Sequence, residues 1–421
     1  MVRSYVEKCF IYSMFVFFLS ISLLGNADKL FFGGIPFRKI TFIFFVSSIV
    51  FYLLYKRIKL GVLICTIFFI IFGFFFAGLV PIVRGLSITD AISQILPYTI
   101  PFLAIFITSF INDDINKTCN DFFSKAIFFV GVMHCVASFS YFFSDEIGNS
   151  IYVILSIYLN DVETTDDMVP DFSGSILVTR IQFGISVFLV LYFYFKIKNV
   201  IFFNSRLNKI KLFVSFIFIL ITQSRALIFS VILIPALYYL YMALQPVFKN
   251  LYSRAVLFVM TLFAPTVLTY LIVRFDPLKI IGLTREYGED LRFLQQESLL
   301  NGLSDNVFFG ISMGAPADIV RSVNTPWIYE LSIIAFIAQI GFLGLALLFG
   351  MLCFFAYYLS TAKSNYYTKF VVNYKENALA LSAIFSFILA SNTNPYLNNF
   401  IGGFILLVFF IEYGRSYIFL K

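Results

Sequence analysis

Long apolar runs separated by short polar segments repeat along the whole chain. Each run approaches the roughly 20 residues that an α-helix needs to cross a bilayer. We predict twelve spans, at 9–24, 39–55, 60–80, 91–111, 126–144, 176–195, 210–222, 226–245, 255–273, 335–360, 377–391 and 399–414. A transmembrane β-barrel would instead show alternating strands of about ten residues. The pattern therefore predicts an all-α, polytopic integral membrane protein with a single transmembrane domain, residues 1–421.

Composition supports this reading, because 60% of the 421 residues are apolar and only 13% are charged. A soluble protein carries about 25% charged residues. The first apolar run follows Arg3 and Lys8 and resembles a signal peptide. No small-residue cleavage site follows it, so we expect a retained first span that also serves as signal anchor.

Charge distribution predicts the orientation. Twelve spans place both termini on one side, and a cytoplasmic N-terminus puts nineteen of the thirty basic residues and six acidic ones inside. The cytoplasmic side is then +13 and the remainder −6, within a net charge of +7. This agrees with the enrichment of Lys and Arg in cytoplasmic loops. A single tilted helix over 211–244 would invert the later spans, but the same bias favours a hairpin with Arg225 at its outer end.

Two predicted outer loops are long enough to hold structure. The loop 145–175 is acidic and contains an apolar run, Ile151 to Leu159, that we expect to lie as an interfacial helix. The loop 274–326 has 53 residues and helical apolar periodicity. Long loops of this kind are usually functional or disordered, and the periodicity favours a structured one. All five cysteines fall in spans or on the cytoplasmic side, so no disulfide is expected.

Several classes of chemistry are excluded. The single histidine, His134, lies in the middle of a span, where we expect it to be packed in the core. No Cys or His cluster exists, so a metal centre with the usual ligands is not expected. The chain has no Gly-rich phosphate loop and no cytoplasmic domain large enough for ATP, which excludes primary active transport.

Arginines are the main candidates for a site. An arginine within the bilayer is costly and tends to face a cavity or a partner, which singles out Arg225. Arg180 opens the sixth span. Either one can also be explained as an interfacial anchor.

The large loop adds two more arginines. An apolar stripe at helical spacing is formed by Leu283, Tyr287, Leu291, Leu294 and Ser298. Arg285 and Arg292 fall on the opposite face, roughly 10 Å apart along the axis. Two guanidinium groups arranged in this way suit a diphosphate. The alternative is a solvated face on which Glu289 pairs with both arginines.

Glu330 is the candidate acid or base. It follows Trp327, an expected interfacial anchor, and precedes the turn Gly341-Phe342-Leu343-Gly344. The stretch from Trp327 to Leu359 has 33 residues and is too long for one perpendicular span. We therefore expect the part before Gly341 to lie along the outer surface or to re-enter, with Glu330 at the outer rim. An interfacial carboxylate without a catalytic role is the alternative.

Together these features resemble the superfamily of O-antigen polymerases and O-antigen ligases, over about residues 175–410. The motifs that carry the resemblance are Gln223-Ser224-Arg225-Ala226, the loop Arg292, Phe309-Gly310-Ile311-Ser312-Met313-Gly314, the Gly341–Gly344 turn and Asn392-Thr393-Asn394-Pro395. Their order, with twelve spans and the large loop before the tenth, is typical of the superfamily.

The resemblance implies transfer of a glycan from an undecaprenyl diphosphate carrier at the periplasmic face of the bacterial inner membrane, with no metal, cofactor or nucleic acid. It also implies lipid-linked oligosaccharide donor and acceptor, with a chain-length regulator as a further partner. Arg225, Arg285, Arg292 and Arg180 would bind the diphosphate, and Glu330, Arg292 and Arg225 would be catalytic.

Two alternatives stay open. Ligases of the superfamily carry a functional histidine at about the position of Glu330, and no histidine lies outside here, which favours a polymerase. A lipid-linked oligosaccharide flippase would show two similar halves and short outer loops, and neither is seen. Arginine nevertheless supplies eight of the eleven outer or embedded basic residues but only five of the nineteen cytoplasmic ones. This excess favours phosphate recognition on the outer side.

Overall fold

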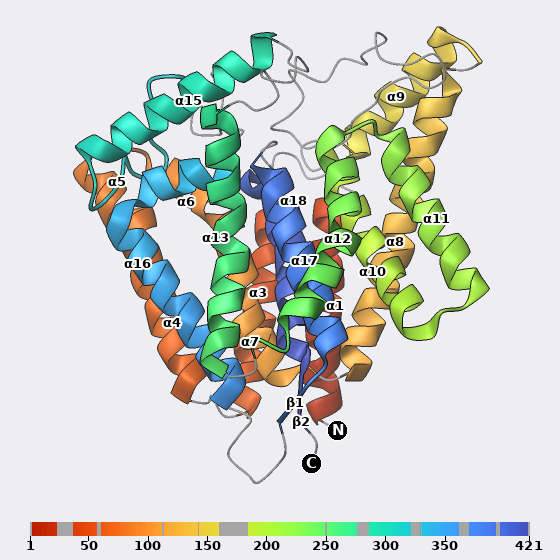
Figure 1. Ribbon diagram of the computed structural model, residues 1–421, viewed down its shortest axis with the longest axis horizontal. Helices are drawn as coiled ribbons and strands as arrows, with labels where there is room; N and C mark the ends of the chain where they lie inside the picture. Colours follow the sequence, from red (N-terminus) through yellow and green to blue (C-terminus); the bar gives the residue numbers. More distant parts are fainter. Residues whose placement is uncertain are drawn as a thin grey trace. The chain divides into compact units, whose positions relative to one another are not determined.

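The computed structural model is almost entirely helical in the residues it describes (Figure 1). These are residues 2–22, 37–56, 60–111, 113–141, 143–159, 184–248, 251–275, 286–320, 329, 331–361, 370–392 and 396–419. Two short strands are the exception to the all-α prediction. β1 (Phe370–Val372) and β2 (Tyr417–Phe419) pair antiparallel, with Phe370 opposite Phe419.

The helices follow one another with few long connections. The α-helices are α1 (Val2–Ser22), α3 (Phe37–Lys56), α4 (Leu60–Gly73), α5 (Val80–Val83), α6 (Ile88–Thr99), α7 (Leu103–Phe110), α8 (Asp113–Ser140), α9 (Asp145–Leu159), α10 (Phe188–Phe203), α11 (Arg206–Ile221), α12 (Arg225–Leu244), α13 (Leu251–Phe275), α15 (Glu286–Asp305), α16 (Ser332–Thr361), α17 (Tyr374–Ser391) and α18 (Phe400–Arg415). A π-helix, η1 (Phe74–Leu79), joins α4 to α5. Short 3-10 turns are η2 (Ile100–Phe102), η4 (Gly184–Val187) and η5 (Tyr396–Asn398).

Among the described residues, eight helical segments are long and apolar enough to cross a membrane. They are Tyr5–Ser22, Phe37–Tyr55, Leu63–Val83, Ile88–Ser109, Asp113–Ser140, Gly184–Phe203, Arg225–Leu244 and Ser332–Phe354. By helix length and hydropathy the chain is therefore a multi-pass membrane protein, as predicted. The other four predicted spans coincide with α11, α13, α17 and α18. The predicted interfacial helix is longer than expected, because α9 already begins at Asp145.

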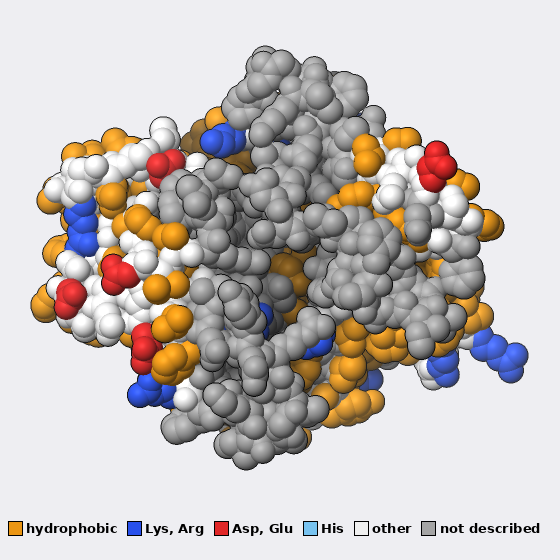
Figure 2. Space-filling view, turned by 90° about the horizontal axis from the view of Figure 1, so that it is seen from above, with side chains coloured by type: hydrophobic (Ala, Val, Ile, Leu, Met, Phe, Trp, Pro, Cys, Tyr) orange, Lys and Arg blue, Asp and Glu red, His pale blue; other side chains and the backbone are white. Residues whose placement is uncertain are grey.

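The exposed helix faces explain why lipid is the expected solvent. On α3, Ser48 and Tyr52 are buried, whereas Ile43, Phe51 and Leu54 are exposed. The outer face of this helix is thus as apolar as its inner face, which is unfavourable in water and suits a bilayer. Figure 2 shows the same character on one face of the molecule, where most of the coloured surface is hydrophobic and charged side chains are scattered.

The described helices form two compact units. The first comprises Met1–Ile58 and Ser109–Val231. Within it α1 packs on α3 through hydroxyl pairs, Ser13 with Ser48 at 2.6 Å and Ser20 with Thr41 at 2.8 Å. Small polar residues of this kind let membrane helices approach and bond to each other. His134 is buried in this unit, with Nδ1 3.2 Å from the Ser186 hydroxyl, as expected for a core histidine.

The second unit comprises Lys59–Thr108 and Ile232–Lys421. It contains α4 to α7, most of α12, and α13 to α18 with both strands. α15 crosses the ends of α13 and α16 instead of running along them (Figure 1). A buried apolar cluster of Leu299, Tyr329, Leu331, Ile334, Ala335 and Ala338 joins α15 to the start of α16. The large loop of the sequence prediction is therefore structured over α15 and the segment 306–320.

Candidate functional site

Two of the five predicted site residues lie among the described residues. Arg225 is the first residue of α12, and Arg292 lies within α15. Arg180, Arg285 and Glu330 lie outside the described residues. Arg225 belongs to the first unit and Arg292 to the second.

The α11–α12 hairpin places Arg225 as the sequence predicted, after a three-residue turn. Gln223 adopts φ 50° there, and the Ser224 amide donates to Oγ1 of Thr222 at 3.2 Å. Arg225 is exposed at the N-terminus of α12. The helix dipole makes this end positive, so a further cation is unfavourable unless an anion binds there.

α16 is broken at Gly341, whose backbone is non-helical at φ 63° and ψ −169°. The segment 307–312 pairs with the backbone around this break. Ile311 N donates to Ala338 O at 2.9 Å and Ser312 N to Gln339 O at 3.1 Å. From the other side of the break, Phe342 N donates to Val307 O at 2.8 Å and Leu343 N to Phe308 O at 2.9 Å.

These four bonds satisfy groups that the interrupted helix can no longer pair internally, which is obligatory away from water. The contact requires glycine on both sides. A Cβ on Gly310 would lie 2.4 Å from Ala338 O, and one on Gly341 would lie 2.2 Å from Gly310 N. The predicted turn at Gly341 is thus confirmed. The structure also brings it against the Phe309–Gly314 motif, which the sequence had placed about thirty residues away.

A buried amide pair fixes this junction to α6. Gln94 Nε2 donates to Gln339 Oε1 at 2.6 Å, and Gly314 N donates to Gln94 Oε1 at 2.6 Å. Gln94 and Gln339 are both buried, and Gln339 Nε2 has no partner among the described residues. One side chain therefore connects the loop, the broken helix and a neighbouring span.

A second polar group surrounds the start of α16. The Tyr98 hydroxyl donates to Ser332 O at 2.9 Å and to Oδ1 of Asn398. Asn398 Nδ2 donates in turn to Tyr329 O at 3.2 Å. The Ser332 hydroxyl donates to Ser391 O at 2.9 Å.

Asn392, from the late predicted motif, belongs to this group too. Its Oδ1 accepts from Ile333 N at 3.2 Å. Tyr329 and Leu331, on either side of Glu330 in the chain, are fully buried. Burial raises the pKa of the Tyr329 phenol, and the nearby Asp318 raises it further, so this group is neutral at physiological pH.

α15 presents a different face from the one predicted. Leu294, placed in the apolar stripe, is 47% exposed, whereas Gln295, Gln296, Ser298 and Leu299 are buried. At 100° per residue, Gln295, Gln296 and Leu299 lie within about 60° of Arg292, and Leu294 lies about 160° away. The expectation that Arg292 points away from the packed face is therefore wrong: it is half-buried and lies on that face.

The prediction failed because it weighed apolar residues only, and the buried face of α15 contains amides. Both polar atoms of the Gln295 side chain, and Oε1 of Gln296, have no partner among the described residues. Unsatisfied buried amides are costly. Arg292 thus stands beside side chains that have hydrogen-bonding capacity left for a ligand.

The outer edge of α15 is held separately. Arg274 and Glu297 form an exposed ion pair at 3.5 Å, and Arg84 Nη2 donates to Asn306 Oδ1 at 2.9 Å. Among the described residues, no group of three or more His, Cys, Asp or Glu side chains could hold a metal ion. The arrangement offers cations and amides to a ligand, which suits phosphates and hydroxyls.

Replacing Gln94 with methionine is expected to lower the free energy of unfolding by about 2 kcal/mol, because it leaves Gly314 N and the Gln339 side chain buried without a partner. Thermal or denaturant unfolding in detergent measures this. Adding Gln339→Met should cost less than the sum of the two single changes, since the pair is then removed together. A Gln94→Met protein within about 0.5 kcal/mol of the wild type, or strictly additive effects, would contradict the coupling.

No protein-family model, curated protein or solved structure matches the chain.

Proposed function

We propose that the chain is a repeat-unit polymerase for a bacterial surface polysaccharide such as O-antigen. It would transfer a growing glycan from an undecaprenyl diphosphate carrier to a lipid-linked repeat unit. The proposed topology has twelve spans, both termini in the cytoplasm of a bacterium, and α15 at the periplasmic face of the inner membrane.

The observation that carries this proposal is the position of Arg292. It lies on the inward face of α15, one turn before the buried and partly unsatisfied amides of Gln295 and Gln296. A guanidinium group binds phosphate oxygens through paired donors. Side-chain amides both donate to and accept from sugar hydroxyls. This face therefore matches the two chemical parts of a lipid-diphosphate sugar.

The chemistry needs cations more than a metal. A polyprenyl diphosphate leaves readily once its developing charge is stabilised, and Arg292 is proposed to supply this, with Arg285, Arg225 and Arg180 as further cations. The acceptor hydroxyl needs a base within hydrogen-bond reach, and Glu330 is proposed for that role. Attack opposite the diphosphate inverts the anomeric centre.

The pinned break in α16 favours transfer over flipping. Four backbone bonds and the Gln94 pair hold the loop against the broken helix. A reaction between two bound substrates benefits from fixed geometry, whereas a flippase site must open toward both sides of the membrane.

The test replaces Arg292 with alanine and reads the glycan ladder of the producing cell. The rate of chain extension is expected to fall roughly 10- to 100-fold, because a hydrogen bond to a charged group contributes about 1.5–3 kcal/mol and other arginines remain. Arg274→Ala is the matched control. That arginine is also at this end of the second unit, but it is exposed and paired with Glu297.

The ladder separates the functions as well as the residue. Loss of a polymerase leaves one repeat unit on the acceptor, whereas loss of a flippase or a ligase leaves the acceptor bare. A bare acceptor in the deletion strain would therefore refute the polymerase proposal. Equal ladders for Arg292→Ala and Arg274→Ala would refute the role of Arg292.

A further inference from the structure

The second unit carries another unsatisfied polar cluster, far from the α16 break. It lies where α12 ends, α13 and α17 begin and α18 ends, and it contains Gln245, Arg254, Asn377 and Ser416. The 18 residues of α17 span about 27 Å. Because the last turn of α17 contacts the start of α16 through Ser391, the two polar regions are at opposite ends of this helix.

Arg254 is the unusual member of this cluster. Its side chain is 4% exposed, yet among the described residues it forms no ion pair with a carboxylate. Nε donates to Phe248 O at 3.0 Å, and the guanidinium carbon lies 5.2 Å from the centre of the Tyr374 ring. Nη1 is buried and has no partner in the described structure. A buried cation without a counter-charge is strongly unfavourable, so an anion is the missing component.

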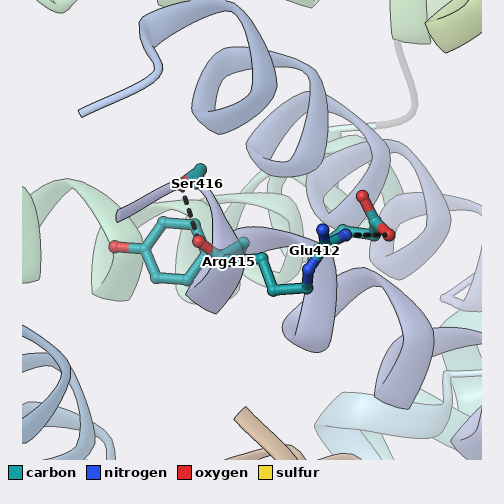
Figure 3. Close-up of polar contacts among 4 residues, drawn as sticks. Glu412, Arg415 and Ser416 are labelled. Carbon is teal, nitrogen blue, oxygen red and sulfur yellow. Dashed lines mark hydrogen bonds and ion pairs between the residues drawn. The ribbon is translucent and has the colours of Figure 1, made fainter. Parts of the chain in front are cut away.

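The nearest described carboxylate on α18 is already engaged. Figure 3 shows the Arg415 guanidinium turned toward Glu412 within the last turn of this helix, at 3.4 Å. Ser416 lies on the other side of the view and donates to Tyr413 O at 2.6 Å. Tyr413 stacks on Phe258 of α13, with ring centres 4.4 Å apart, one turn beyond Arg254. α18 is therefore fixed beside Arg254 without neutralising it.

Gln245 supplies a second unsatisfied group. Its Nε2 donates to Asn377 Oδ1 at 2.8 Å, and Asn377 Nδ2 donates to the Ser416 hydroxyl at 2.9 Å. Gln245 Oε1 is buried and lacks a partner among the described residues. Asn377 follows Tyr374 by three residues on the first turn of α17, so both contacts lie on one helix face. An unused donor and an unused acceptor thus stand beside the same turn.

The surrounding backbone also favours an anion. Both α13 and α17 begin at this cluster, at Leu251 and Tyr374, and helix N-termini carry partial positive charge and unpaired N–H groups. We propose that Arg254 binds the phosphate of a hydroxyl-bearing headgroup, with Gln245 Oε1 accepting a hydrogen bond from its hydroxyl. The phosphate can belong to a glycerophospholipid at the membrane surface or to a soluble ion. This site is independent of the proposed transfer reaction.

The test uses the purified full-length chain in detergent with phosphatidylglycerol, phosphatidylcholine or inorganic phosphate. Phosphatidylglycerol is expected to raise the unfolding temperature by about 3 °C, as mass action predicts for a ligand well above its Kd. Phosphatidylcholine, which lacks the headgroup hydroxyl and the net charge, should have less effect. Native mass spectrometry counts bound lipid in the same samples.

The decisive comparison is Arg254→Gln with the control Arg206→Gln. Arg206 is an exposed arginine at the start of α11, which the sequence places on the same side of the membrane. The shift should disappear in Arg254→Gln and persist in Arg206→Gln. A shift with phosphatidylglycerol alone identifies a lipid site, and an equal shift with inorganic phosphate identifies a soluble ligand.

Two results would overturn the proposal: equal shifts in the wild type and Arg254→Gln, or no shift with any of the three probes. If Arg254→Gln does not fold, Gln245→Met is compared instead. That change removes the acceptor and keeps the cation, so binding of phosphatidylglycerol should weaken while inorganic phosphate is unaffected. Unchanged phosphatidylglycerol binding in Gln245→Met would then refute the site.

Discussion

Alanine at Gly341 is expected to destabilise the chain by about 4 kcal/mol or more, enough to prevent accumulation of folded protein. Its φ of 63° and ψ of −169° belong to a region that is essentially restricted to glycine and costs about 1–3 kcal/mol for other residues. The new Cβ would also lie 2.2 Å from Gly310 N and 2.7 Å from Phe308 O. Both are backbone atoms, so the two segments must separate and their four hydrogen bonds weaken.

The control is Gly350→Ala in the same helix. A Cβ at Gly350 meets nothing within 4 Å, and its backbone is ordinary helix. Alanine there should be neutral or stabilise by up to about 1 kcal/mol, the difference in helix propensity. Folded yield and unfolding temperature in detergent measure both variants. Similar values for Gly341→Ala and Gly350→Ala would mean that the break is not required for stability.

Glutamine at Glu330 is expected to slow repeat-unit transfer by about 10²–10⁴-fold, the usual contribution of a general base. The change removes the carboxylate while keeping the size of the side chain. Its neighbours Tyr329 and Leu331 are fully buried, and Tyr329 O accepts from Asn398, so the adjacent backbone is held independently of Glu330. The measurement is single-turnover extension of lipid-linked repeat units by purified protein.

Glu297→Gln is the matched control for this assay, because Glu297 is exposed on α15 and pairs with Arg274. Its activity should stay within about threefold of the wild type, since exposed ion pairs contribute little. An unfolding temperature for Glu330→Gln equal to that of the wild type separates chemistry from folding. Activity of Glu330→Gln close to that of Glu297→Gln would assign the base to another residue.

Much of the fold follows from hydropathy alone. Each of the twelve predicted ranges contains a helix, and the interruption at Gly341 is present. The ends were less predictable. α8 begins at Asp113, well before the predicted 126, because its polar first turns continue a helix that hydropathy cannot detect. The pairing of β1 with β2 depends on two three-residue segments far apart in the chain, too short for any periodic signal.

The candidate site was predictable in its motifs but not in its contacts. The sequence singled out Phe309–Gly314 and Gly341–Gly344 separately, and only the fold pairs their backbones. Gln94 and Gln339 gave no signal, because a lone amide in an apolar run looks the same whether or not a partner faces it. The face of α15 was predicted wrongly for a related reason: its buried side includes Gln295 and Gln296.

The break in α16 also has a consequence for biogenesis. Residues 307–312 are synthesised before 338–343, so the partner of the break leaves the ribosome first. Until the two segments meet, the backbone groups exposed at Gly341 lack the bonds that they make in the finished protein. Unpaired backbone groups are costly in hydrocarbon. Insertion of this span should therefore wait on the preceding loop, and a chain shortened within 306–314 should be left with α16 incompletely integrated and open to proteolysis.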